Sequence, residues 1–76
     1  MNRAKRTTLK TAISQLDAAL SIVEDVRDEE EADMENLPEN LHESEKYSAM
    51  EDVINSLEEA IGSIEDARDS LDEAIA

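Results

Sequence analysis

The segment LPENLHES, residues 37–44, separates two stretches of the chain in which apolar residues recur at helical spacing. Pro38 is the only proline, and it lacks the backbone amide hydrogen that a helix interior requires. Because the residue before a proline avoids the helical region, a first helix is expected to end at Leu37. Ser44 is a favourable N-terminal cap for a second helix. The sequence therefore predicts two helices joined by a short turn, residues 38–43.

Both stretches place their apolar residues in alternating steps of three and four. This spacing averages 3.5 residues, which is typical of a coiled-coil seam, and no stretch alternates with the period of two that indicates a strand. The seam positions are Leu9, Ile13, Leu16, Leu20, Val23, Arg27, Glu30, Met34 and Leu37, then Tyr47, Met50, Ile54, Leu57, Ile61, Ile64, Arg68, Leu71 and Ile75. We expect an all-α fold, an antiparallel two-helix coiled-coil hairpin of residues 8–37 and 44–75, preceded by a basic N-terminal arm, residues 1–7.

The turn length fixes how the two helices face each other. If the numbers of facing residues sum to 84, every layer of the seam is filled, with Leu20 opposite Ile64 and Met34 opposite Met50. A slip of one heptad in one direction leaves no room for the turn, and a slip in the other direction needs a much longer loop. This register is the one that we expect.

One flank of the predicted seam is acidic. In an antiparallel pair these positions line one groove, and we expect them to form a partner-binding face. They are Asp17, Glu24 and Glu31 of the first helix with Glu51, Glu58, Glu65 and Asp72 of the second.

Two arginines interrupt the seam beside this acidic flank. Arg27 is expected to reach Glu24 or Glu31 on its own helix, and also Glu58 across the hairpin. Arg68 is expected to reach Glu65 or Asp72 on its own helix, and also Asp17 across the hairpin. Two interpretations stay open: the arginines set the register and relieve repulsion between the acids, or they contact an anionic ligand.

The other flank is small and neutral. Small side chains at helical spacing allow helices to approach closely, and a two-helix hairpin cannot cover both sides of its own seam. We interpret this flank as the interface of a homodimer that forms a four-helix bundle; a solvated serine-alanine face is the alternative. Its residues are Ala12, Gln15, Ala19, Ile22 and Val26, with Val53, Ser56, Ala60, Ser63, Ala67, Ser70 and Ala74.

Charge and composition exclude several classes of protein. The chain has 76 residues, 21 acidic and 7 basic side chains, a net charge of −14 and no cysteine, so one small domain without a zinc ribbon or disulfide scaffold is expected. Direct binding of nucleic acid is disfavoured because the phosphates repel such a chain. No apolar run is long enough for a membrane span or a signal segment, and we expect a cytoplasmic location. Residues 1–10 differ from the rest, with four basic residues and no acid.

The residues that catalysis or metal binding would need are missing. His42, the only histidine, lies in the turn and has no evident nucleophile beside it. The acidic run at residues 28–35 lacks the central glycine and alternating ligands of a calcium loop. There is no glycine-rich phosphate loop and no helical Glu-x-x-His pair for a di-iron centre. We therefore expect no enzyme activity, no metal and no cofactor.

The turn and the second helix resemble a known group of proteins. Residues 36–47, the pair Met50-Glu51 and the Leu-Glu-Glu-Ala-Ile run at residues 57–61 are similar to short acidic helical-hairpin proteins of bacteriophages and prophages. The resemblance covers residues 34–76, and the Leu-Pro-Glu-Asn-Leu turn is its most specific part. It implies a phage accessory protein in the host cytoplasm, and it supplies no activity and no functional residues.

Three functional hypotheses follow. The first is a non-enzymatic accessory protein that binds a host or phage protein, for example an inhibitor of host defence whose acidic surface mimics nucleic acid. The second is an oligomer that sequesters an anionic nucleotide through Arg27 and Arg68. The third is a structural or assembly element of a virion.

Overall fold

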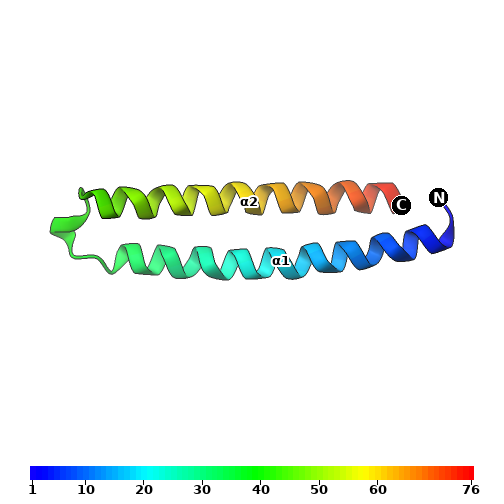
Figure 1. Ribbon diagram of the computed structural model, residues 1–76, viewed down its shortest axis with the longest axis horizontal. Coiled ribbons are helices and arrows are strands. Elements are labelled where there is room, and N and C mark those ends of the chain that lie inside the picture. The colour runs from blue at the N-terminus through cyan, green and yellow to red at the C-terminus, as the bar shows by residue number, and fades with distance from the viewer.

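The computed structural model describes all 76 residues and contains two long helices that lie side by side (Figure 1). Helix α1 spans Arg3–Glu35 and helix α2 spans Glu45–Ile75, and a single 3-10 turn, η1, spans Glu39–Leu41 between them. The helices run antiparallel, so both termini lie at one end and the turn lies at the other (Figure 1). The predicted all-helical hairpin without strands is confirmed.

The start of α1 differs from the expected start at residue 8. The side-chain oxygen of Asn2 accepts a hydrogen bond from the backbone amide of Lys5 at 2.8 Å, and the backbone oxygen of Asn2 accepts one from Arg6. Asparagine is among the strongest N-terminal caps, so this pair of bonds starts the helix at Arg3. The prediction of a separate basic arm was therefore wrong, because these basic residues form the first turns of α1.

The turn begins two residues earlier than expected. Helix α1 ends at Glu35, and the amide of Leu37 donates to the backbone oxygen of Met34 at 3.2 Å, which tightens the last turn before Pro38. After η1, the Ser44 side-chain oxygen accepts a hydrogen bond from the Tyr47 amide at 3.3 Å. The prediction that Ser44 caps the second helix is confirmed.

Two side chains, those of His42 and Tyr47, make contacts across the turn. Nε2 of His42 lies 2.9 Å from the backbone oxygen of Leu37, and the His42 ring stacks on Tyr47 with a centroid distance of 4.9 Å. The only histidine and the only tyrosine of the chain therefore hold the end of α1 against the start of α2.

The core is a narrow line between the helices. Only Leu20, Ile54 and Ile61 are buried, and the other apolar seam residues are half-buried. The molecule measures 59 × 14 × 13 Å, and its radius of gyration of 17.4 Å exceeds the roughly 11 Å expected of a compact domain of this length. Two helices alone therefore cover little of their own apolar surface.

One contact between the helices bears on the register. Nη1 of Arg68 on α2 lies 3.4 Å from Oδ1 of Asp17 on α1. A slip of one heptad would move the helices by about 10 Å along each other and would separate these groups. The contact therefore agrees with the register in which facing residue numbers sum to 84.

Cysteines test this register directly, because the chain has no cysteine of its own. A Leu20→Cys, Ile64→Cys variant should form a disulfide within one chain under mild oxidation, since these positions face each other. Mass spectrometry of the unreduced monomer measures it. A Leu20→Cys, Leu57→Cys control should not form a disulfide, because Leu57 lies about 10 Å along α2 from the position of Ile64. Oxidation of the control pair alone would refute the register.

Candidate functional site: two flanks of the hairpin

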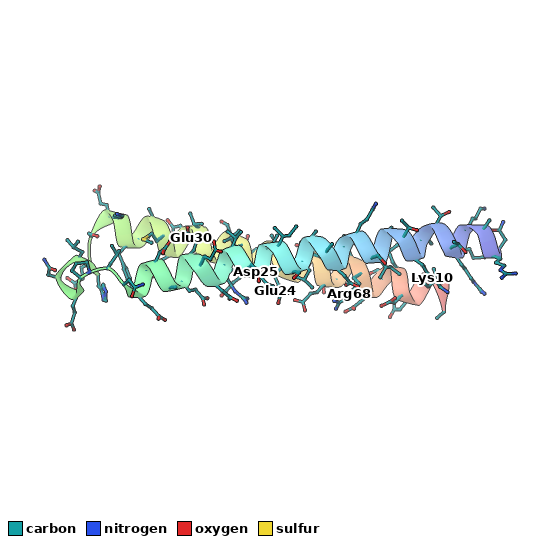
Figure 2. The ribbon with its side chains drawn as sticks, turned by 90° about the horizontal axis from the view of Figure 1, so that it is seen from below. Lys10, Glu24, Asp25, Glu30 and Arg68 are labelled. Carbon is teal, nitrogen blue, oxygen red and sulfur yellow. The ribbon has the colours of Figure 1, made fainter.

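The acidic flank follows one long edge of the hairpin. Asp17 and all four acids that α2 contributes are exposed, whereas Glu24 and Glu31 are half-buried. Glu24 and Arg68 lie along the same edge in Figure 2. The structure thus brings residues of the two helices, distant in sequence, to one edge, where most of their side chains are exposed to solvent.

Arg68 lies between the two helices on this edge. It bonds to Asp17 across the hairpin, as expected, and to Asp69 on its own helix at 3.4 Å, which was not expected. The hydrogen bond to Asp17 is the main cause that raises the pKa of Arg68. Its predicted partners Glu65 and Asp72 form no ion pair with it. Arg68 therefore links the two helices at the acidic edge.

Arg27 does not make the contacts that the sequence predicts. Its Nη2 lies 3.1 Å from Oδ1 of Asp28, the next residue, and no ion pair joins it to Glu24, Glu31 or Glu58. This hydrogen bond to Asp28 is the main cause that raises the pKa of Arg27, and Glu31 and Glu24 add to it through charge alone. The expected pairing was wrong, because an adjacent exposed carboxylate lies nearer than those one turn away.

Both guanidinium groups are thus occupied by carboxylates of their own chain. Their side chains are only 25% and 28% exposed, and no aromatic residue other than Tyr47, in the first turn of α2, is available to stack a base. This arrangement supports the interpretation that the arginines reduce repulsion and set the register, and it gives no support to a nucleotide site.

The neutral flank exposes its largest side chains. Ile22, Val26 and Val53 are 64%, 43% and 47% exposed. The half-buried members of the flank are Ala12, Ala19 and Ala60, and the exposed small or polar members are Gln15, Ser56, Ser63, Ala67, Ser70 and Ala74. Along one face of a single hairpin, branched apolar side chains are therefore exposed to solvent beside small side chains.

One feature of the end that carries the termini was not expected from the sequence. Met1, Ala4, Lys5, Thr8 and Leu9 line an open hollow on the first turns of α1. The first turns of α1 also reach past the end of α2 (Figure 1). The Asn2 cap was the available signal, because it extends the helix beyond the last residue that α2 can face.

No cluster of histidine or acidic side chains in the structure has a geometry that could hold a metal ion. Neither helix carries an apolar stretch long enough to cross a bilayer. The site of interest is therefore the pair of flanks.

Comparison of the chain with models of known protein families, with curated proteins and with solved structures finds no match. The resemblance to phage hairpin proteins stays a prediction.

Replacing Arg68 tests its role on the seam. Arg68→Leu should raise the midpoint of urea unfolding, because an apolar side chain would then complete the layer opposite Leu16. The same change should weaken selection of one register, so a Leu20→Cys, Ile64→Cys pair should oxidise less completely in this background. Circular dichroism and mass spectrometry measure the two effects. Arg68→Lys is the control that keeps the charge; a midpoint of Arg68→Leu below that of wild type would contradict the interpretation.

Proposed function

We propose that this chain is a non-enzymatic helical-hairpin protein that acts by binding other macromolecules. The neutral flank joins two copies into a four-helix bundle, and the acidic flank faces a positively charged surface of another protein. The observation that carries the proposal is the division of the hairpin into one flank with seven acids and one flank with exposed Ile22, Val26 and Val53.

Surface area supports the dimer. The single hairpin exposes 5500 Å², whereas a folded monomer of 8.5 kDa typically exposes about 4,700 Å². The excess of roughly 800 Å² is the area that each partner buries in a protein interface of standard size. A second copy stacked on the neutral flank would therefore bring the exposed surface of each copy close to that of a folded monomer of the same mass.

The chemistry of the neutral flank also favours a helical partner. Alternation of alanine and serine with branched residues allows close packing of helices, in which a large side chain fits against a small one. The acidic flank cannot serve this purpose, because two copies of it would bring like charges together. The neutral flank is thus the side that we assign to assembly.

The acidic flank has the charge of a nucleic-acid backbone. A basic surface that normally holds DNA or RNA has the complementary charge, and long-range attraction would steer the hairpin to it. The resemblance to phage proteins suggests a host-defence protein as the owner of that surface. Occupying it would inhibit the host protein without any chemistry on the part of the hairpin.

The dimer is tested by a charge on the neutral flank. Ile22→Glu should raise the dimer dissociation constant by about 100-fold or more, because burying an unpaired carboxylate costs several kcal/mol. Sedimentation equilibrium measures the change. The hairpin itself should stay folded on this account, because Ile22 is mostly exposed within one chain.

Ser21→Glu is the matched control. It adds the same charge one residue earlier on α1, at an exposed position outside the flank, and should leave the dimer intact. If Ile22→Glu and Ser21→Glu sediment alike, the neutral flank does not form the interface.

The acidic flank is tested by neutralising its charges on α2. A Glu51→Gln, Glu58→Gln, Glu65→Gln variant should lose most of its binding to a basic host protein recovered by affinity capture. The wild-type complex should dissociate as salt is raised, because attraction between exposed charges is screened. Binding of the purified pair by calorimetry at two salt concentrations measures both effects.

The control removes as many charges from the outer face of the same helix. Asp52→Asn, Glu59→Gln, Asp66→Asn alters exposed neighbours of the three test residues and should retain binding. Equal losses in the two variants would show that net charge, rather than the acidic flank, attracts the partner.

A further inference from the structure

We propose that the second copy docks on the neutral flank with its turn at the opposite end, so that the basic first turns of each α1 lie against the acidic last turns of the other. This inference rests on the dimer proposed above and adds its direction. Two hairpins stacked face to face have two symmetric choices, turns at the same end or turns at opposite ends.

The distribution of charge along the hairpin separates these choices. Residues 20–65, which form the half that contains the turn, carry 16 acidic and 2 basic side chains; the remaining residues carry 5 of each. The entire net charge of −14 therefore resides in the turn half. Stacking with turns together places −14 against −14, whereas stacking with turns apart places −14 against a neutral half.

The first turns of α1 lack a partner within the hairpin. In the observed register no residue of α2 lies opposite Lys5, and all of residues 1–8 are exposed. Figure 1 shows this overhang of α1 past α2. The ion pairs of the hairpin involve only the basic residues Arg27 and Arg68. None is formed by the basic residues at the start of the chain, Arg3, Lys5, Arg6 and Lys10. A basic helical segment is thus left over at the end that carries the termini.

The turn end holds the complementary group. Of the acids in residues 28–35, only Asp28 is in an ion pair. Glu29 and Asp33 continue the line of the neutral flank toward the turn, and both are exposed. With turns apart, the overhang of one copy reaches these carboxylates in the other.

The heptad spacing of the neutral flank is symmetric about Ala19. At intervals of seven, α1 presents Lys5, Ala12, Ala19, Val26 and Asp33. An antiparallel contact of two α1 helices centred on Ala19 pairs Ala19 with Ala19 of the second copy, Ala12 with Val26 and Lys5 with Asp33. Ala12 with Val26 sets a small side chain against a larger one, Lys5 with Asp33 sets a basic one against an acidic one, and Ala19 with its own copy allows the two helices to approach closely.

The distance between the turn of one copy and the turn of the other distinguishes the two directions of docking. A spin label on Asn40→Cys, in a chain with no other cysteine, should give a separation near the 59 Å length of the hairpin by pulsed electron paramagnetic resonance. Turns at the same end would give about 20 Å, the width of two helices, and would overturn the proposed direction alone. Absence of any dipolar coupling between labels would overturn the dimer itself, and with it the assembly part of the proposed function.

Charge reversal tests the end contacts. Lys5→Glu and Asp33→Lys should each weaken the dimer about 3- to 10-fold, and the double variant should regain most of the loss. These residues are separated by about 42 Å along the same helix, so recovery requires contact between copies. Lys10→Glu, which makes the same charge change on the acidic side of α1, is the matched control and should have a smaller effect. A double variant weaker than both single variants would contradict the contact.

Discussion

The apolar seam between α1 and α2 is the interaction on which the rest of this structure depends. Burial of apolar surface is the main force that can order so short a chain, and the hairpin concentrates it in Leu20, Ile54 and Ile61 near the middle of its length. The other apolar seam residues are only half-buried. The exposed flanks are the direct result of building a protein from two helices.

Charge decides how the two flanks differ. An acidic side chain on the neutral flank would be tolerated by a single hairpin but would resist the approach of another helix. An apolar side chain on the acidic flank would shield the seam better but would weaken attraction to a basic surface. The chain keeps its acidic side chains and its exposed branched apolar ones on opposite flanks, and the proposal of two separate binding faces rests on that separation.

The arginines and the helix caps satisfy charges and backbone amides at particular points of the hairpin. Arg68 joins Asp17 across the helices, at a point where carboxylates would otherwise face one another without a counter-charge. Asn2 and Ser44 bind backbone amides that would lack partners at the two helix starts. At the turn, the His42 ring stacks on Tyr47, and its Nε2 lies within hydrogen-bond distance of the Leu37 backbone oxygen.

The sequence by itself determined the number of helices, the place of the turn, the cap at Ser44 and the contact between Arg68 and Asp17. It could do so because the period of a helix and the length of a short turn leave one arrangement of the seam. The composition of the two flanks follows from the same period, so the residues of the candidate faces could also be read from the sequence.

The tertiary structure decided the rest. It showed that Asn2 starts α1 before the basic residues, which an argument from charge alone had placed in a separate arm. It showed that Arg27 bonds Asp28, because a long flexible side chain has several carboxylates within reach and local geometry chooses among them. It also showed that the Ile22 side chain is largely exposed. Sequence spacing gives only the side of the helix on which a residue lies, whereas its exposure depends on what the second helix covers.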